Sequence, residues 1–320
     1  MMIPPFKTVP SFHTRPWGGR AMAEILGKRI PDGPVGESWE VSAHAHGISR
    51  VADGPFAGMS LAELARQAGP ALLGEAVHAR SGGEFPVLLK LIDVNSLASV
   101  QVHPDDEQAR RLEGFPRGKT EAWYVIARKP SASFRLGMIE GVTEDALRAA
   151  LAAGGASKLL ASPEVSAGDC LLVPPGTVHA CGNGVLLLEV QQSCDITYRV
   201  YDWDRVDENG NRRALHVEKA MQVIDFAARP VVSRAEPGTD RLARLLECAS
   251  FEMFEAHLGS GMTLATRPSC AAGTLIAGSC TLRSADTSIE LACGDSFVVP
   301  AGTPAELDGG PAGLILTVLR

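Results

Sequence analysis

The chain has few aromatic residues, no closely spaced cysteine pair and no long apolar run. Phe, Trp and Tyr make up 5% of the 320 residues. No stretch approaches the roughly 20 apolar residues that a membrane-spanning helix needs, and the Pro-interrupted N-terminus lacks the apolar core of a secretory signal. Seven cysteines without a C-x-x-C pair predict reduced, buried thiols. We therefore expect a cytoplasmic protein without a membrane partner.

Basic charge is also scarce, since 30 Lys and Arg face 37 Asp and Glu and the net charge is −7. Nucleic acids bind largely through neutralisation of their phosphates by basic side chains. The acidic balance therefore argues against nucleic acid as the main partner, although a local basic pocket for one phosphate stays compatible with it. The composition does not indicate an oligomeric state.

Turn-forming residues are abundant, with 33 Gly and 21 Pro, and most of the chain consists of short β-rich runs bounded by Gly, Pro, Asp and Ser. Such spacing favours a barrel or sandwich. Helical signals are few and local. We expect helices after Ser60, which with Glu63 forms a capping-box pattern, and at 105–112, 143–153 and 215–226.

A twelve-residue motif occurs twice, as GDCLLVPPGTVH at 168–179 and GDSFVVPAGTPA at 294–305, with six of twelve positions identical. Each copy reads as a strand between two turns, and its repetition indicates a duplicated unit. The pattern G-D-x-x-x-V-P-x-G resembles the second motif of the cupin barrels. We therefore predict a mainly β fold of two cupin-like (jelly-roll) β-barrels with a few short helices.

The predicted domains are an N-terminal metal-binding cupin domain with helical insertions at 1–230 and a degenerate C-terminal cupin domain at 231–320. His179 of the first motif copy corresponds to Ala305 of the second. Only the first barrel is therefore expected to bind a metal ion.

Candidate metal ligands gather in a few β segments. In SVQVHP, the period of two places Ser99, Gln101 and His103 on one strand face and the intervening valines on the other. Glu121 follows where the chain re-enters a strand, and His179 ends the first motif copy. Two imidazoles, a carboxylate and an amide oxygen suit Zn²⁺, and Fe²⁺ nearly as well.

At these residues the chain resembles the type I phosphomannose isomerases. The resemblance is carried by FPVLLKLIDVNSLASVQVHPDD (85–106), EVQQSCDITYRVYDWDR (189–205), RPWGG (15–19) and GESWEVSAH (36–44). It implies one Zn²⁺ per chain and a small phosphorylated sugar as substrate, with interconversion of mannose 6-phosphate and fructose 6-phosphate. The implied site residues are Gln101, His103, Glu121 and His179 for the metal; Ser99, Lys90 and Lys119 for the substrate and its phosphate; and Glu189 and Arg199 in the active site. Trp17, among Gly-rich turns, is a candidate for lining the sugar entrance, and plain packing is the favoured alternative for it.

Aldose–ketose isomerisation moves a proton between C2 and C1 through an enediol, which requires an acid/base within reach of both carbons. Glu189 is the first candidate and Lys119 the second, with a phosphate contact as the alternative for Lys119. Arg199 could stabilise anionic oxygens or form a structural ion pair with a nearby Asp. Lys90, inward on an apolar strand, needs either a ligand or a buried acid as partner.

Two other functions use the same scaffold. An Fe(II)-dependent cupin oxygenase would need the same His and Glu ligands but no Lys and Arg around them. A non-catalytic sugar-phosphate-binding cupin would need no complete set of metal ligands, whereas all four candidates are present here.

Overall fold

The computed structural model describes residues 3–206, 209–236, 238–285 and 287–320. The chain divides into two compact units, which are described separately. Unit 1 comprises the chain up to Asp93, Leu188–Ser193 and Ser233–Arg320, and unit 2 comprises Val94–Leu187 and Cys194–Val232. The predicted domain boundary between residues 230 and 231 stays a prediction.

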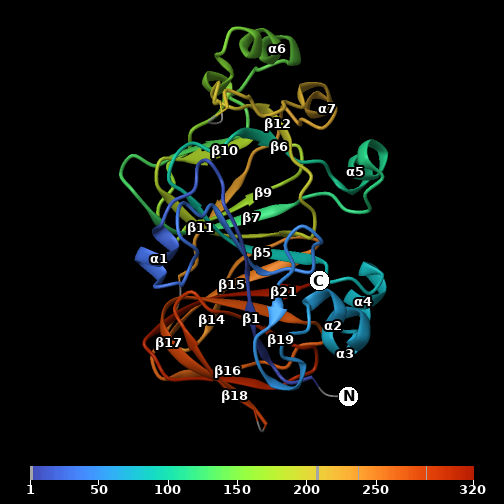
Figure 1. The fold of residues 1–320 in the computed structure, drawn as a ribbon, viewed down its shortest axis with the longest axis vertical. Helices are drawn as coiled ribbons and strands as arrows, with labels where there is room; N and C mark the ends of the chain where they lie inside the picture. Colours follow the sequence, from blue (N-terminus) through green and yellow to red (C-terminus); the bar gives the residue numbers. More distant parts are fainter. Residues whose placement is uncertain (1–2, 207–208, 237, 286) are drawn as a thin grey trace. The chain divides into compact units, whose positions relative to one another are not determined.

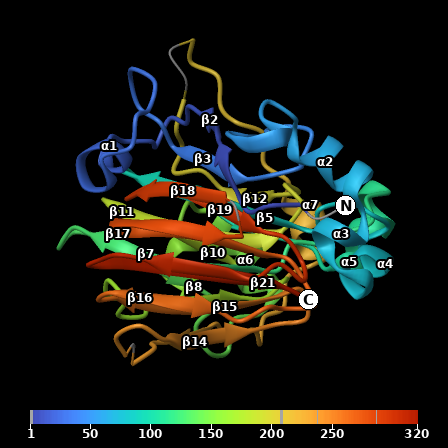
Figure 2. The ribbon, with the colours of Figure 1, turned by 90° about the horizontal axis from the view of Figure 1, so that it is seen from below.

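Unit 1 is built on an antiparallel sheet whose strands run in the order β14-β15-β21-β17-β19-β1-β4 (Figure 1). Their bounds are β14 (Leu242–Glu247), β15 (Phe251–Leu258), β21 (Ala312–Leu319), β17 (Ala271–Ser284), β19 (Ser296–Val299), β1 (Phe6–Val9) and β4 (Arg50–Val51). Figure 2 shows β17, β21, β15 and β14 side by side. Strands β16 (Gly261–Leu264), β18 (Thr287–Ala292) and β20 (Ala305–Asp308) extend this sheet through pairs with β17 and β20.

A second set of strands in unit 1 pairs β2 with β3 and β3 with β5, all antiparallel. Here β2 is Ser11–His13, β3 is Glu37–Val41 and β5 is Val87–Val94, whose last residue belongs to unit 2. The helices of unit 1 are α1 (Ala21–Leu26), α2 (Leu61–Ala68), α3 (Pro70–Leu73) and α4 (Glu75–Ser81), with one 3₁₀ turn at Gly54–Phe56. Helices α2, α3 and α4 lie next to one another in both views.

Unit 2 contains an antiparallel sheet in the order β12-β6-β10-β8, and β7 pairs with β9. The strands are β6 (Val100–Val102), β7 (Glu121–Arg128), β8 (Ser133–Leu136), β9 (Cys170–Val173), β10 (His179–Gly182) and β12 (Tyr198–Tyr201). The helices are α5 (Asp106–Glu113), α6 (Glu144–Ala152) and α7 (Val217–Met221), with a 3₁₀ turn at Ala156–Leu159. Strands β11 (Val185–Gln192) and β13 (Val231–Ser233) contribute residues to both units.

The predicted helix signals correspond to helices in the structure. Ser60 caps α2 and exchanges hydrogen bonds with Glu63, which completes the capping box. Thr143 caps α6, and Asp105 caps α5. The segment predicted as helical at 215–226 is helical only over Val217–Met221. No helix in the described ranges is long and apolar enough to cross a bilayer.

The two motif copies have the same local structure. The strand of each copy is four residues long, and the entering glycines, Gly168 and Gly294, both have a φ of 87°. The following Asp accepts a hydrogen bond from the amide three residues earlier, at 2.7 Å for Asp169 and 2.9 Å for Asp295. Positive φ at this turn favours glycine, which explains why this residue is repeated.

The fold class predicted from the sequence, mainly β with a few short helices, is therefore confirmed. The residue that corresponds to His179 in the second motif copy is Ala305. Ala305 is buried in an apolar core together with Phe297, Leu307 and Leu316. At this position an apolar methyl group stands in place of the imidazole of the first copy. That only the first barrel binds a metal ion stays a prediction.

Candidate metal centre and neighbouring ion pairs

Gln101 of β6 lies in one row of the unit 2 sheet with two other predicted site residues. Gln101 lies opposite His179 of β10 on one side and opposite Arg199 of β12 on the other. Residues directly opposite in antiparallel strands point to the same face. Val100 and Val102 belong instead to an apolar core that includes buried residues of α6 and α7. The alternation predicted from SVQVHP is thus observed.

Both histidine rings are oriented by backbone carbonyls. His103 Nδ1 lies 2.8 Å from the carbonyl oxygen of Ile196, and His179 Nδ1 lies 2.9 Å from that of Thr177. A carbonyl oxygen can only accept, so Nδ1 of each ring carries the proton. The Nε2 atom of each ring is therefore left with its lone pair, which is the form of imidazole that binds metals.

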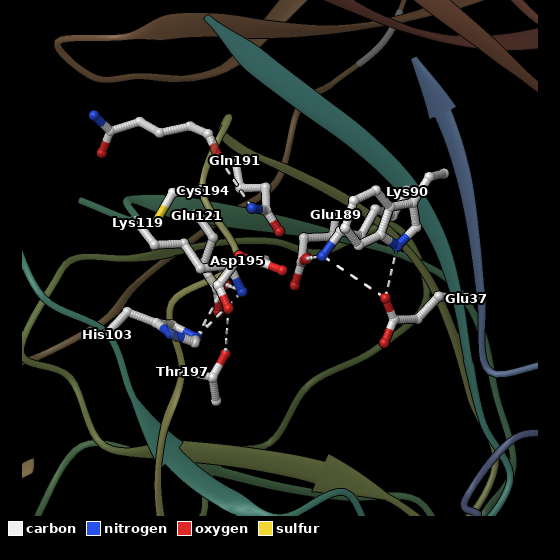
Figure 3. Close-up of polar contacts among 12 residues, drawn as sticks. Glu37, Lys90, His103, Lys119, Glu121, Glu189, Gln191, Cys194, Asp195 and Thr197 are labelled. Atoms are coloured by element: carbon white, nitrogen blue, oxygen red, sulfur yellow. Dashed lines mark hydrogen bonds and ion pairs between the residues drawn. The ribbon is translucent and has the colours of Figure 1, made fainter. Parts of the chain in front are cut away.

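The Nε2 atoms of both rings lie close to one buried carboxylate, and Figure 3 shows His103 and Lys119 beside this group, Glu121. Glu121 Oε2 lies 3.5 Å from His103 Nε2, and Glu121 Oε1 lies 3.1 Å from His179 Nε2. The three ligand atoms fall within 4.8 Å of one another, and all three side chains are buried. Three buried acceptors repel one another unless a positive charge lies between or beside them.

Lys119 supplies positive charge at this point. Its Nζ lies 2.6 Å from Glu121 Oε2 and 3.2 Å from His103 Nε2. Lys119 is buried, and it precedes Glu121 by two residues, the spacing that places two side chains on one strand face. The centre therefore combines a set of metal ligands with an ammonium group in direct contact with it.

Gln101 and Ser99 extend the centre along β6. Gln101 Nε2 lies 3.3 Å from His179 Nε2, and Ser99 Oγ donates to Gln101 Oε1 at 3.4 Å. The two ends of a side-chain amide have nearly the same shape, and a half-turn of the amide directs Oε1 toward the histidines. The structure thus brings together all four predicted metal-binding side chains.

Arg199 lies in the same row but does not form the ion pair considered from the sequence. Asp202 pairs with Arg205 and Arg213, whereas Arg199 Nη1 donates to the Ala214 carbonyl at 2.9 Å. Its buried Nε has no hydrogen-bond partner among the described residues. Burial lowers the pKa of Arg199, and the nearby Arg213 guanidinium lowers it further. Arg199 therefore keeps donor capacity for an anionic ligand.

Unit 1 holds a separate group of buried charges around Lys90 (Figure 3). Lys90 Nζ lies 3.2 Å from Glu189 Oε1 and 3.8 Å from Glu37 Oε2. It also lies 4.7 Å from the centre of the Trp39 ring, a cation–π distance. The structure thus shows a buried acid as the partner of Lys90, and it brings the predicted Lys90 and Glu189 together.

Glu37 belongs to this group but was not singled out from the sequence. Arg15 Nε and Trp39 Nε1 each donate to it at 2.7 Å. Burial alone would raise the pKa of Glu37, but the charges of Lys90 and Arg15 and the hydrogen bonds from Trp39 and Arg15 together outweigh burial and lower it to about 2. The signal was present in GESWEV, where Glu37 and Trp39 share a strand face. Trp17 is nearly buried and packs against Gly36.

Two imidazoles and one carboxylate around a common point form a ligand set for a divalent metal such as Zn²⁺ or Fe²⁺. The fold and this centre define a mainly β protein with a candidate mononuclear metal site. Comparison with known proteins makes the class specific. Residues 6–132 match the family model for the catalytic domain of type I phosphomannose isomerase.

Relatives extend the match along the chain. The mannose-6-phosphate isomerase ManA of Bacillus subtilis is 35% identical over 305 residues, which cover 94% of this chain and 95% of the relative. A mannose-6-phosphate isomerase of Streptococcus mutans is 42% identical over 70% of this chain and 68% of its own length. The solved structure of a Bacillus subtilis mannose 6-phosphate isomerase has a TM-score of 0.88 and 33% identity, covering 98% and 99% of the two chains. The chain belongs to the type I phosphomannose isomerase family.

Proposed function

We propose that this enzyme interconverts mannose 6-phosphate and fructose 6-phosphate in a zinc-dependent reaction that proceeds through an enediol. Its membership of the family and the names of its relatives support the substrate. The observation that carries the proposal is the buried convergence of His103, Glu121 and His179. A substrate-binding cupin without catalysis would not need this ligand set.

Zn²⁺, one per chain, is the metal we assign to Gln101, His103, Glu121 and His179. The ligands fit because both imidazoles are fixed with Nε2 unprotonated and because Glu121 brings a negative charge that burial makes costly without a cation. When bound, the zinc ion supplies Lewis-acid stabilisation for the substrate oxygens. Lys119, whose Nζ contacts Glu121, would move aside or share the carboxylate when the metal is present.

The remaining residues act on the proton and on the charge of the sugar phosphate. Glu189 is our first candidate for carrying the proton between C2 and C1, since a buried carboxylate can accept and return it. Lys119 is the second candidate. Arg199 would stabilise anionic oxygens through its free donors, and Ser99, Lys90 and Trp17 would hold the substrate.

The central experiment is metal analysis paired with a coupled isomerase assay. Wild-type protein should contain one zinc per chain and turn over mannose 6-phosphate, with activity abolished by a chelator and restored by zinc. His179→Ala should lose both metal and activity. His257→Ala removes an exposed imidazole that pairs with Glu255 and should change neither. A zinc-loaded wild type that leaves mannose 6-phosphate unchanged would reject the proposal, and oxygen uptake by ferrous protein would favour the oxygenase.

The proton carrier is tested by two variants that keep the shape of the side chain. Glu189→Gln and Lys119→Met should each be assayed for zinc content and for exchange of the C2 proton with deuterated solvent. The variant that keeps zinc but loses both exchange and turnover, by roughly a hundredfold or more, identifies the carrier. If both variants retain exchange, neither residue moves the proton.

We also propose that the enzyme acts in the cytoplasm on a free sugar phosphate, without nucleic acid or a membrane. Seven cysteines that are not in disulfides support the location. The net charge of −7 argues against nucleic acid as a partner. Cell fractionation checks it, and activity recovered in a membrane or nucleoid fraction would contradict it.

A further inference from the structure

The segment leading into β6 is held by a loop at the end of the 189–205 segment, whose structural role the sequence did not indicate. This loop, Asp202–Arg205, is called the Trp203 loop, and it belongs to unit 2 together with β6. Trp203 Nε1 donates to the Ala98 carbonyl at 2.7 Å, and Arg205 Nη1 donates to the Leu97 carbonyl at 2.5 Å. Two consecutive carbonyls immediately before Ser99 are therefore fixed by side chains from more than a hundred residues further along the chain.

The same segment is also held by β10 and by the residue that follows it. Ala98 N donates to the Cys181 carbonyl at 2.9 Å, and Asn183 N donates to the Ser96 carbonyl at 3.3 Å. Gly182 allows this approach, because a Cβ there would lie 2.7 Å from Leu97 Cα. Residues 96–98 are thus hydrogen-bonded to two separate segments of the chain.

The Trp203 loop adopts a backbone conformation that its residues do not favour. Trp203 has a φ of 57° and Asp204 a φ of 55°, so two consecutive non-glycine residues are left-handed. A bulky residue in this region is strained, and such strain persists only where the surroundings impose it. The loop is held at its first residue, because the Asp202 carboxylate accepts hydrogen bonds from both Arg205 and Arg213.

The fixed segment ends at residues assigned to the site. Ser99 follows Ala98 directly and donates to Gln101, which lies opposite His179 in the sheet. Movement of Ala98 would therefore shift Ser99 first and Gln101 next. The strained loop donates two side-chain hydrogen bonds to this segment. Such an arrangement is expected where a binding residue, here Ser99, must be held in place.

We propose that Trp203 is a positioning residue, which holds the start of β6 so that Ser99 and Gln101 keep their places in the site. Arg205 assists through Leu97. The part of this role that concerns substrate rests on the proposed isomerase function, because Ser99 is assigned there to the substrate. The part that concerns the backbone of residues 96–99 does not depend on it.

The test compares Trp203→Phe with Tyr201→Phe. The first keeps an aromatic ring but removes the indole donor to Ala98. The second removes the hydroxyl of Tyr201, whose ring lies against that of Trp203. This hydroxyl donates to exposed Asp204 and not to residues 96–98. Trp203→Phe should raise KM for mannose 6-phosphate about tenfold with kcat within about twofold, since it weakens binding in the ground state and transition state alike. Tyr201→Phe should leave both unchanged.

Amide hydrogen exchange supplies a readout that needs no activity. The Ala98 amide, which donates to Cys181, should exchange faster in Trp203→Phe and at the wild-type rate in Tyr201→Phe. Arg205→Lys, which removes the guanidinium donor to Leu97, should shift exchange and KM in the same direction. Unchanged Ala98 exchange in Trp203→Phe would overturn the proposal. So would an unchanged KM accompanied only by a lower melting temperature. An inactive wild type would reject the isomerase function, and the exchange result would still decide whether Trp203 positions β6.

Discussion

The charge on Glu37 should make a pH-dependent contribution to stability, and Glu37→Gln removes that charge with little change in shape. The pKa of Glu37 is lowered to about 2 from its ordinary 4.5. A carboxyl group with a lowered pKa stabilises the folded state above its unfolded-state pKa, and the contribution is lost as pH falls through the folded-state value. At 1.36 kcal/mol for each pKa unit, the shift corresponds to about 3 kcal/mol at pH 7.

The contribution should shrink on acidification by an amount that follows from the same two pKa values. About 1 kcal/mol is lost between pH 7 and pH 4, and about 2 kcal/mol by pH 3. In the Glu37→Gln variant the amide oxygen could still accept from Trp39 Nε1, and Lys90 would keep Glu189 as its partner at 3.2 Å. The full 3 kcal/mol is therefore an upper value for the difference between wild type and variant.

Urea unfolding followed by circular dichroism at pH 7, 5 and 4 measures this difference. Glu37→Gln should be less stable than wild type by up to about 3 kcal/mol at pH 7, and the deficit should be about 1 kcal/mol smaller at pH 4. Glu164→Gln, at an exposed position outside the helices, serves as the control and should be as stable as wild type. A deficit for Glu37→Gln that is independent of pH, or that grows on acidification, would refute the assignment of the lowered pKa.

Three further predictions concern local structure in unit 1. Ser60→Ala removes the N-cap of α2 and should cost about 1 kcal/mol in chemical denaturation, whereas Ser60→Thr should retain most of that stability. Gly74→Ala should lower the free energy of unfolding by roughly 3 kcal/mol or more, because φ is 86° and a Cβ would lie 2.0 Å from the Pro268 carbonyl oxygen. Gly82→Ala, where φ is 65° and the space is open, should lower it by only about 1 kcal/mol. Burial raises the pKa of the Cys270 thiol, so mass spectrometry after alkylation should find it unmodified in native protein and modified in urea. Equal costs for the two glycine variants, or labelling of native Cys270, would contradict this reasoning.

Local features of the fold could be predicted because they depend on neighbouring residues. The capping box at Ser60 and the turn at Gly168 follow from side-chain hydrogen bonds and φ preferences within a few positions. The shared face of Ser99, Gln101 and His103 follows from the two-residue period of a strand. The helix expected at 215–226 is shorter than its composition suggested, since absence of Gly and Pro permits a helix but does not fix its length.

The sequence by itself determined which side chains are available for chemistry and the duplicated strand-and-turn unit that carries His179. Only the tertiary structure decided which partners they meet. Strand register set His179 opposite Gln101, and the packing of separate sheets brought Glu121 to both imidazoles. Asp202, in the loop after β12, pairs with Arg205 and Arg213 instead of Arg199. Turn and cap preferences act within a few residues, whereas most of these pairings join positions far apart in the chain. The burial and competition between charges that select among such partners exist only once the chain has folded.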